Sequence, residues 1–296
     1  MVSRMRKSRH TALLMCFSIS VLLISSQVRA EWEPSGQLEV HYINVGQGGA
    51  TLIIGPNGTR VLYDLGRVDG RRHLLPYLRD TLKLTPEQGL HYTIVSHRDK
   101  DHYMGLKALV DAGYDVKVAN YGSGSAKADS KTMRKNWLGP AAQTLAGTVR
   151  PIPVGLRLAL GDGAELIVIA ANGRILGKQE LLSVPNENDR SVVVLIKYGK
   201  FDYILDGDLG AGAESCTQHQ TRQRNLQEPV AIALFTEGLL DENHGVDVMH
   251  IAHHGSESST SAAYYNLLRP EVGLISVGMD QGNFRHPRKD VVEGVL

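Results

Sequence analysis

The chain has 296 residues, enough for one large domain or two small ones with a sizeable core. A hydrophobic content of 42% and a charged content of 21% are those of an ordinary globular protein, which excludes a mostly disordered, collagen-like or coiled-coil chain. The formal net charge is +1, but residues 1–30 hold five of the 32 basic residues and none of the 31 acidic ones, which leaves residues 31–296 at −4 and excludes nucleic-acid binding by bulk charge.

Residues 1–30 have the three-part pattern of a secretory signal peptide. A basic segment precedes an apolar run of 14 residues at 12–25, and Val28 and Ala30 occupy positions −3 and −1 of a cleavage site. Because the run is shorter than the roughly 20 residues that span a bilayer, we expect cleavage rather than an uncleaved anchor. Residues 31–296 are therefore expected to form a periplasmic or secreted domain with no stable membrane insertion after cleavage.

The first half of this domain shows strand and helix patterns in turn. Residues 38–45 alternate as a strand, and 50–54 with 60–64 predict a β-hairpin around Pro56-Asn57-Gly58. Helices are predicted at 71–82 and 103–112, with a short one beginning at Thr85-Pro86, and strands at 91–96 and 115–120. The Gly-, Ser- and Lys-rich segment 121–136 is expected to be a mobile loop or lid.

The second half is richer in strands. They are predicted near 156–160, 165–170, 192–198, 201–206, 246–252 and 271–278, with a helix at 258–268 and a polar, weakly helical stretch at 210–228. Hairpins first and alternating strands and helices later predict a layered α/β fold with mixed sheets. Once the leader with Cys16 is removed, Cys216 is the one remaining thiol, which excludes a disulfide-stapled fold.

The segment SHRDKDHYMG, residues 96–105, carries the strongest chemical signal because it directly follows a predicted strand. Two histidines and two aspartates fall within six residues: His97, Asp99, Asp101 and His102. Without a cation such groups would repel one another or stay solvated, and imidazoles with carboxylates suit Zn, Mn or Fe. The alternative is a charged surface loop in which the histidines are coincidental.

Two other predicted strands end in similar groups. Asp206-Gly-Asp208 follows the strand at 201–206 and suits a bridging metal ligand, or is a plain Asp-Gly turn. His253 and His254 follow the strand at 246–252, as metal ligands or as a pair of surface or core histidines. All three features lie at the carboxyl ends of predicted strands, where α/β proteins place their sites.

At this point the chain resembles the metallo-β-lactamase-fold hydrolase superfamily, and within it the soluble domain of ComEC-type competence proteins and their secreted stand-alone relatives. The matching segments are INVGQGGATLII at 43–54, VLYDLG at 61–66, SHRDKDH at 96–102, NDRSVVVLI at 188–196, YILDGDLG at 203–210, VDVMHIAHHGS at 246–256, and RPEVGLISVG with NFRHP at 269–287. Seven ordered matches over residues 38–288 are far more specific than any one of them. The resemblance implies one domain over residues 31–296, an αββα sandwich of two mixed sheets with the metal site at one edge.

The resemblance also implies a ligand set and two divalent ions, Zn or Mn. The implied ligands are His97, Asp99, Asp101, His102, Asp208 and His254. Asp99 stands where many members have a histidine, which tilts the preference toward Mn or mixed use. Asp64 is expected to orient the metal-binding loop without being a ligand itself. Asn188 falls near the position at which the zinc hydrolases have a further histidine. His253 is the alternative ligand if the register differs by one.

Two departures from the family pattern are visible. The early loop reads Asn44-Val-Gly-Gln47-Gly-Gly49 where the family usually has Asp-Val-Gly-Gln-Gly-Asp, so two carboxylates that could serve substrate binding are missing. Relatives usually continue with a final strand beyond the His-Pro motif, so we expect this sequence to be either a short form or a domain truncated at its C-terminus.

The first functional hypothesis is a secreted metal-dependent phosphodiesterase or nuclease that uses a metal-activated water. Its expected catalytic residues are Asp101, His253 and His286, and its expected substrate contacts are Ser256, Lys127 and Arg134. The basic run from Lys127 to Lys135 could attract phosphate, with Trp137 or Tyr121 available for stacking, although such a run is otherwise a solvated loop.

Two other hypotheses stay open. The fold hosts hydrolysis of lactones, phospholipid headgroups and β-lactams, so the fold does not choose among these bonds. A non-catalytic, metal-stabilised binding protein belongs to a different class. The sequence gives no indication of the oligomeric state.

Overall fold

The computed structural model describes residues 32–67, 72–212, 223–279 and 285–295. The predicted signal peptide and Cys216 lie outside these ranges. Glu31–Leu296 is one structural unit. Within the described ranges, no helix combines the length and the apolar character that crossing a bilayer requires.

Sheet A has six strands in the order of the chain. They are β1 (Glu39–Tyr42), β2 (Thr51–Ile54), β3 (Arg60–Tyr63), β4 (Leu90–Val95), β5 (Val116–Gly122) and β6 (Arg150–Pro151). The first three pair antiparallel, and β3 to β6 pair parallel. The predicted hairpin is confirmed: Gly55 N donates to Thr59 O at 2.8 Å, and Thr59 N donates to Asn57 Oδ1 at 2.9 Å. The parallel strands bring their carboxyl ends to one edge.

Sheet B has seven strands in the order β13-β12-β11-β10-β8-β7, with β9 paired to β8. They are β7 (Arg157–Gly161), β8 (Ala164–Ala171), β9 (Arg174–Ile175), β10 (Val193–Tyr198), β11 (Phe201–Leu205), β12 (Val248–His250) and β13 (Val272–Leu274). Strands β11, β12 and β13 are parallel, and the remaining pairs are antiparallel. The carboxyl ends of β11 and β12 carry the predicted Asp208 and His253-His254 features.

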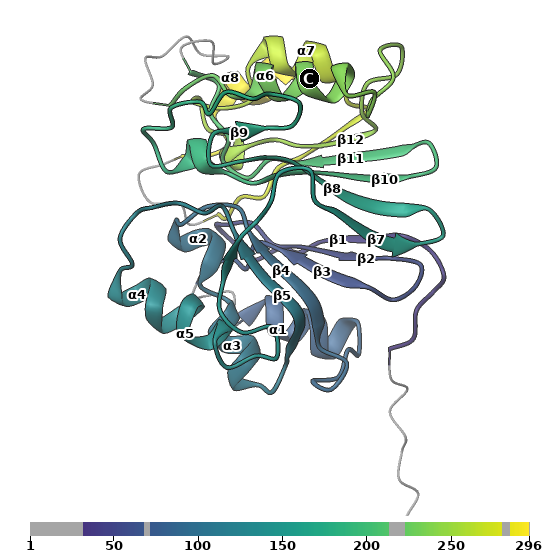
Figure 1. Cartoon of the computed structure of the whole chain (residues 1–296), viewed down its shortest axis with the longest axis vertical. Coiled ribbons are helices and arrows are strands. Elements are labelled where there is room, and N and C mark those ends of the chain that lie inside the picture. The colour runs from purple at the N-terminus through teal and green to yellow at the C-terminus, as the bar shows by residue number, and fades with distance from the viewer. Residues whose placement is uncertain (1–31, 68–71, 213–222, 280–284, 296) are drawn as a thin grey trace, which may run out of the picture. The chain divides into compact units, whose positions relative to one another are not determined.

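Short helices connect the strands. They are α1 (Leu74–Pro76), the π-helix η2 (Tyr77–Thr81), α2 (Lys100–Tyr103), α3 (Leu106–Asp111), α4 (Lys131–Met133), the π-helix η3 (Arg134–Leu138), α5 (Gly139–Ala141), the 3₁₀ turn η4 (Asn188–Arg190), α6 (Gln227–Thr236), the 3₁₀ turn η6 (His253–Gly255), α7 (Ala262–Leu268) and α8 (Lys289–Val295). Figure 1 shows α1, α3, α4 and α5 on the outer side of sheet A, and α6, α7 and α8 on the outer side of sheet B.

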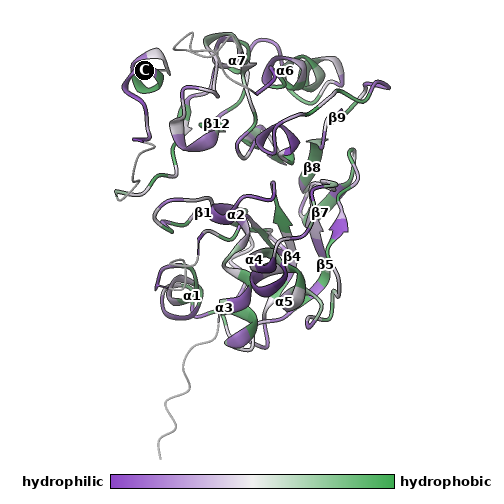
Figure 2. Ribbon diagram, turned by 90° about the vertical axis from the view of Figure 1, so that its left-hand side faces the viewer, coloured by the Kyte–Doolittle hydropathy of each residue, from purple (hydrophilic) through white to green (hydrophobic). Residues whose placement is uncertain are grey.

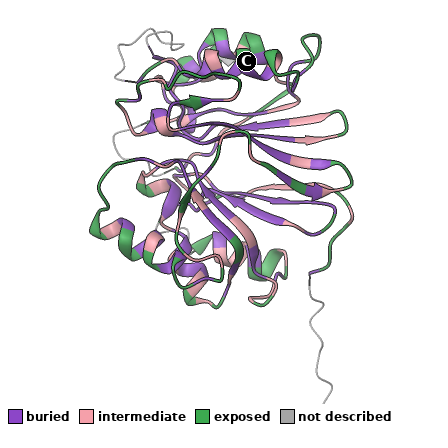
Figure 3. Ribbon diagram, in the orientation of Figure 1, coloured by how far each residue is buried: buried purple, intermediate pink, exposed green. Residues whose placement is uncertain are grey.

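Strand alternation explains the layers. In β2, Leu52 and Ile54 join the core under the sheet A helices, while Ile53 joins the core between the sheets. In β10, Leu195 packs under the sheet B helices and Val194 faces the other sheet. Both faces of these strands are buried, so they read as continuous apolar runs. Buried strands dominate the centre of Figure 3, and β4 and β8 are among the hydrophobic segments of Figure 2. The predicted αββα arrangement of two mixed sheets with flanking helices is confirmed.

Several local predictions need correction. The short helix at Thr85-Pro86 is wrong, since residues 86–88 form a turn. The expected loop at 121–136 is irregular only over 123–130, because β5 runs to Gly122 and helical structure begins at Lys131, where Ser130 Oγ accepts from Met133 N at 3.1 Å. Helices α6 and α8 were not predicted.

Trp137 is not available for stacking on a ligand base. Only 1% of it is exposed, and its ring stacks on Tyr103 with centroids 5.8 Å apart. The residues 133 and 137 are four apart and both buried, so the helix turns Met133 and Trp137 into the core below sheet A. The Gly and Ser residues of the segment 121–136 favoured a loop in the sequence and hid the helical spacing of residues 133 and 137.

Candidate metal centre

The loop after β4 supplies the first group of polar side chains. His97 and His102 are buried, with 0% and 1% of their surface exposed, while Asp99 and Asp101 lie nearer the rim. The helix α2 begins at Lys100, so Asp101 and His102 stand in its first turn. This short helix turns both side chains from consecutive positions toward sheet B.

The strand ends of sheet B supply the second group. Asp208 is buried three residues beyond the end of β11, and His253 and His254 follow β12. Both histidines have positive φ, 54° and 58°, a conformation that costs energy for residues other than glycine. Non-glycine residues held there cluster at functional sites. This strained backbone directs the two consecutive imidazole side chains toward the same space.

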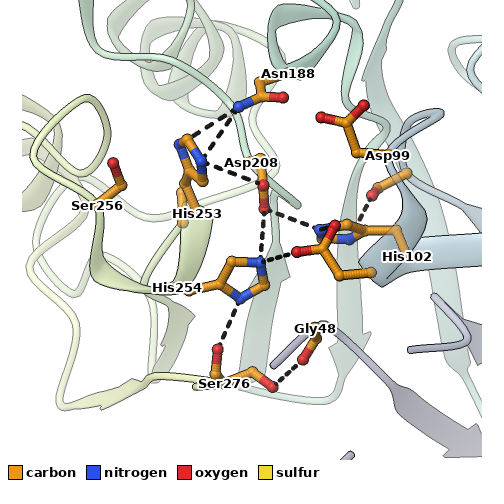
Figure 4. A network of polar contacts seen from close by, with 12 residues as sticks. Gly48, Asp99, His102, Asn188, Asp208, His253, His254, Ser256 and Ser276 are labelled. Carbon is orange, nitrogen blue, oxygen red and sulfur yellow. Dashed lines mark hydrogen bonds and ion pairs between the residues drawn. The ribbon is translucent and has the colours of Figure 1, made fainter. Parts of the chain in front are cut away.

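Asp208 lies at the middle of the cluster, and its two oxygens face different partners (Figure 4). Oδ2 is 3.7 Å from His97 Nε2 and 3.6 Å from His253 Nε2. Oδ1 is 3.4 Å from His102 Nε2 and 3.8 Å from His254 Nε2. Asp101 closes the second set, since its Oδ2 is 3.5 Å from His254 Nε2. One carboxylate therefore separates two sets of nitrogen and oxygen donors.

Internal oxygens hold three of the histidines by their other ring nitrogen. His102 Nδ1 donates to Asp64 Oδ2 at 2.7 Å, and His254 Nδ1 donates to the carbonyl of Ser276 at 2.7 Å. His97 Nδ1 lies 3.0 Å from Ser96 Oγ, whose own hydroxyl donates to Asp64. This leaves each Nε2 directed at the cluster, the arrangement typical of metal-binding histidines.

Four buried atoms at the centre have no hydrogen-bond partner among the described residues: His97 Nε2, His102 Nε2, His254 Nε2 and Asp208 Oδ1. Buried polar atoms are normally paired, so four together need an explanation. Ligand atoms of His97, His102 and Asp208, and of Asp101, His102 and His254, lie within 4.8 Å of one another. Imidazole nitrogen and carboxylate oxygen suit Zn or Mn, so the residues present fit a metal.

Burial and charge set the protonation of the cluster. Burial, and next the His102 ring, lower the pKa of His97 to about 3. Burial alone would raise the pKa of Asp208, but the surrounding histidines hold it well below its usual range. Burial would lower the pKa of His102, but the carboxylates of Asp208 and Asp64 raise it well above its usual value. A metal that binds His102 must therefore displace a proton.

The remaining predicted site residues lie around this centre. Asp99 is 43% exposed at its side chain, with Oδ2 3.8 Å from His97 Nε2 and Oδ1 3.6 Å from Lys127 Nζ. Asn188 Nδ2 is 3.3 Å from His253 Nε2. The ring of His286 lies 5.6 Å from that of His253, and burial and the neighbouring histidines lower its pKa to about 4.

Two predicted substrate contacts lie off the centre. Ser256 stands beside His253 and away from Asp208 in Figure 4, and its Oγ is 3.1 Å from Ser258 Oγ. Arg134 is exposed and its Nη1 donates to the carbonyl of Asp129 at 2.6 Å. Neither residue lines the pocket that holds the cluster.

That pocket has a volume of about 340 Å³, and three residues that line it were not among the predicted site residues. Gln47 comes from the early loop, Arg67 from the segment after β3, and Lys100 from the metal loop itself. Although two carboxylates of the family's early loop are absent here, Gln47 of this loop still lines the pocket. Exposed cations have no period or spacing that marks them in a sequence, which explains why Arg67 and Lys100 were missed.

We expect Asp64→Asn to weaken metal affinity about 10–100-fold, the usual effect of losing a partner behind a ligand. Asp64 is 1% exposed and accepts from Ser96 N at 2.7 Å as well as from His102. The amide of asparagine would present to His102 Nδ1 either its NH2 group, which is a donor, or its carbonyl oxygen, which is a weaker acceptor than a carboxylate. Titration with Mn or Zn by calorimetry measures the change, and unaltered affinity would contradict the orienting role.

The chain resembles known proteins in sequence and in fold. No protein-family model matches the chain. It is 27% identical over 278 residues to Recombination protein 2 of Haemophilus influenzae, covering 90% of this chain and 26% of that protein. It is 25% identical over 278 residues to ComE operon protein 3 of Bacillus subtilis, covering 88% of this chain and 30% of that protein. The chain thus spans less than a third of the length of these relatives.

Solved structures with similar folds include the metallo-β-lactamase fold protein YhfI of Bacillus subtilis, with a TM-score of 0.48, 11% identity and coverage of 86% of this chain and 90% of that one. The metallo-β-lactamase FIM-1 of Pseudomonas aeruginosa has a TM-score of 0.42, 11% identity and coverage of 75% and 81%. Its two mixed sheets with flanking helices are the layered arrangement that the resemblance to the metallo-β-lactamase fold implies, and the sequence match along almost its full length makes this chain a distant homologue of the ComEC/Rec2 competence proteins.

Proposed function

We propose that this chain is a metal-dependent phosphodiesterase that cleaves nucleic acid. The observation that carries the proposal is the pairing of a metal-ligand cluster with cations at the same pocket. Arg67 and Lys100 line the pocket, and Lys127 stands 3.6 Å from Asp99 at its rim. An anionic substrate needs such cations, whereas a neutral lactone does not. One relative, Recombination protein 2 of Haemophilus influenzae, is named for recombination, a process that acts on nucleic acid.

We further propose that the cluster holds two divalent ions, Zn or Mn. The two oxygens of Asp208 face different sets, His97 with His253 and His102 with His254. A carboxylate in this position can serve both sets at once. When bound, the ions would supply a water of lowered pKa and positive charge beside the attacked phosphate.

The chain's own residues then divide the remaining work. Arg67 and Lys100 neutralise and orient the phosphodiester. His286 lines the pocket beside His253, and its neutral ring can take a proton from the attacking water and give it to the leaving oxygen. Asn188 holds the His253 ring in place. The basic, apolar and small-residue pattern of residues 1–30 supports a periplasmic or secreted location for this activity.

The test uses purified residues 31–296 with Mn or Zn and measures cleavage of single- and double-stranded DNA. We expect metal-dependent cleavage that EDTA abolishes and that Asp101→Ala lowers more than about 100-fold, since Asp101 contacts His254. Asp111→Ala is the matched control because Asp111 is exposed on α3 and, among the described residues, its ion pair is with Lys107 at the surface. If the metal-loaded protein does not cleave DNA, the nuclease proposal is wrong. The hypotheses of a lactone or phospholipid hydrolase and of a non-catalytic binding protein would then be favoured.

A further inference from the structure

Ser276 lies two residues beyond the end of β13, and 6% of it is exposed. Its carbonyl accepts from His254 Nδ1 at 2.7 Å, and its hydroxyl donates to the carbonyl of Gly48 at 2.5 Å (Figure 4). His254 follows β12 of sheet B, whereas Gly48 stands between β1 and β2 of sheet A. One residue therefore joins a candidate metal ligand of sheet B to the early loop of sheet A.

The early loop in turn contacts the loop that carries the first group of ligands. Gly49 N donates to the carbonyl of Asp101 at 3.3 Å, and the carbonyl of Gly49 accepts from Gly66 N at 2.8 Å. Gly48 packs so closely there that a Cβ on it would lie 2.3 Å from the carbonyl oxygen of Asp101. A movement of the early loop must therefore move the backbone of Asp101.

These contacts form a closed network, because Asp101 Oδ2 lies 3.5 Å from His254 Nε2. From His254 the network runs through Ser276 and Gly48 to Asp101 and back to His254; we call it the Ser276 network. Asp101 and His254, together with His102, are one of the two groups of possible metal ligands. Apart from the two ligand side chains, the hydroxyl of Ser276 is the side-chain group in this network, and the other links are backbone groups that a substitution does not remove.

The other group of donors has different supports. His97 Nδ1 lies 3.0 Å from Ser96 Oγ, and His253 Nδ1 lies 3.1 Å from Ser258 Oγ. These two contacts involve neither the early loop nor the segment after β13. A change at Ser276 should therefore act on one group of donors and spare the other.

The early loop and the segment after β13 pack tightly around this hydroxyl. Gly278 N donates to Gln47 Oε1 at 3.3 Å, and a Cβ on Gly278 would lie 2.5 Å from Gln47 N. Tyr42 donates its hydroxyl to the carbonyl of Leu274 at 3.4 Å. Gly48 itself is buried, so its carbonyl depends on an internal donor.

We propose that the Ser276 hydroxyl is a positioning group that sets the distance between Asp101 and His254. It thereby sets the affinity of the metal position that these two residues form with His102. Without the hydroxyl, the buried carbonyl of Gly48 would lose its donor, and the early loop would have to move to find another. That movement would carry Asp101 away from His254.

This inference rests on the two-ion centre proposed above and makes its two positions unequal. The position at Asp101 and His254 depends on a contact between the two sheets, whereas the position at His97 and His253 does not. Occupancy of the first position at low metal concentration should therefore depend on Ser276.

The test titrates the metal-free full chain with Mn²⁺ by calorimetry and resolves the two binding steps. We expect Ser276→Ala to weaken one step about 10-fold, the lower end of the range for losing a group that supports a ligand, and to leave the other step unchanged. Ser123→Ala is the matched control, because Ser123 is 5% exposed and its hydroxyl has no hydrogen-bond partner among the described residues. It should leave both steps unchanged.

A double variant shows whether Ser276 acts through Asp101. Asp101→Ala removes a donor of the dependent position, so the ion that remains would be held by His97, Asp208 and His253. Adding Ser276→Ala to Asp101→Ala should then leave the affinity for that ion unchanged, since the two changes act on the same position. Isolated Mn²⁺ ions and close pairs of them give different electron paramagnetic resonance spectra. With two equivalents of Mn²⁺, at a protein concentration near the dissociation constant of the weaker step, the Ser276→Ala protein should show more of the isolated signal than the wild type.

Equal weakening of both steps by Ser276→Ala would overturn the proposal, because the hydroxyl would then support the whole centre. A further loss of affinity in the double variant would overturn it too. If the wild type and Ser276→Ala both bind two ions with the same affinities, the positioning role is wrong and the two-ion centre stands. A wild type that binds one ion would contradict the two-ion centre and this inference with it. No nucleic acid enters the titration, so the cleavage assay tests the nuclease separately.

Discussion

Replacing Asp208 by asparagine is expected to remove DNA cleavage by more than about 100-fold and to lower the number of bound metal ions from two to at most one. Asp208 is 3% exposed, and its two oxygens face two different sets of histidines. An amide offers one oxygen acceptor, and its nitrogen would face the Nε2 of a histidine. Loss of a residue that supports a metal ligand already costs about 10–100-fold, so loss of an oxygen that we propose as a ligand should cost more.

Elemental analysis of the dialysed protein counts the metal, and the DNA assay measures activity on the same sample. Asp111→Asn is the control, because it makes the same chemical change at an exposed site on α3. Two ions per chain in the Asp208→Asn protein would contradict a bridging carboxylate. One ion per chain in the wild type would contradict the two-ion centre, whatever the variant does.

Gly48→Ala is expected to disturb the metal centre although Gly48 is not one of its ligands. Gly48 has φ of 128°, and a Cβ there would lie 2.3 Å from the carbonyl oxygen of Asp101. The two backbones must separate, which moves Asp101 away from His254. We expect a loss of about 2–4 kcal/mol in the free energy of unfolding, from the clash and the backbone strain together, with metal affinity lowered more than about 10-fold.

Gly46→Ala is the matched control two residues away. Gly46 has φ of 75°, so alanine is strained there too, but a Cβ would have nothing within 4 Å. It should cost about 1–2 kcal/mol of stability and leave metal affinity unchanged. Urea denaturation measures the stabilities and calorimetric titration the metal. Equal metal affinities in the two variants would show that the early loop does not hold the metal loop in place.

The strand ends were the predictable part of the site. His97, His102, Asp208 and His254 lie two to seven residues beyond the ends of β4, β11 and β12, so an apolar run followed by ligand-type residues places each of them. Asp64 follows β3 in the same way. The layered α/β fold followed from the alternation of strands and helices, and the resemblance to competence proteins supplied the sandwich arrangement.

Other features had no local signal. Trp137 lies in a Gly- and Ser-rich neighbourhood and reads as exposed, yet the packing of η3 under sheet A buries it against Tyr103. Asp99 reads like the other members of its motif, yet α2 begins after it and leaves its side chain 43% exposed. The order of residues in a motif does not say which side chains a following helix turns inward.

The sequence by itself determined which residues could bind a metal and where the strands that carry them end, because ligand types and apolar runs are local properties of the chain. Only the tertiary structure decided that Arg67 and Lys100 share a pocket with this cluster, and that the segments after β3, β4, β11 and β12 meet there. Parallel pairing brings separate strand ends to one edge, and exposed cations follow no period that predicts where they meet.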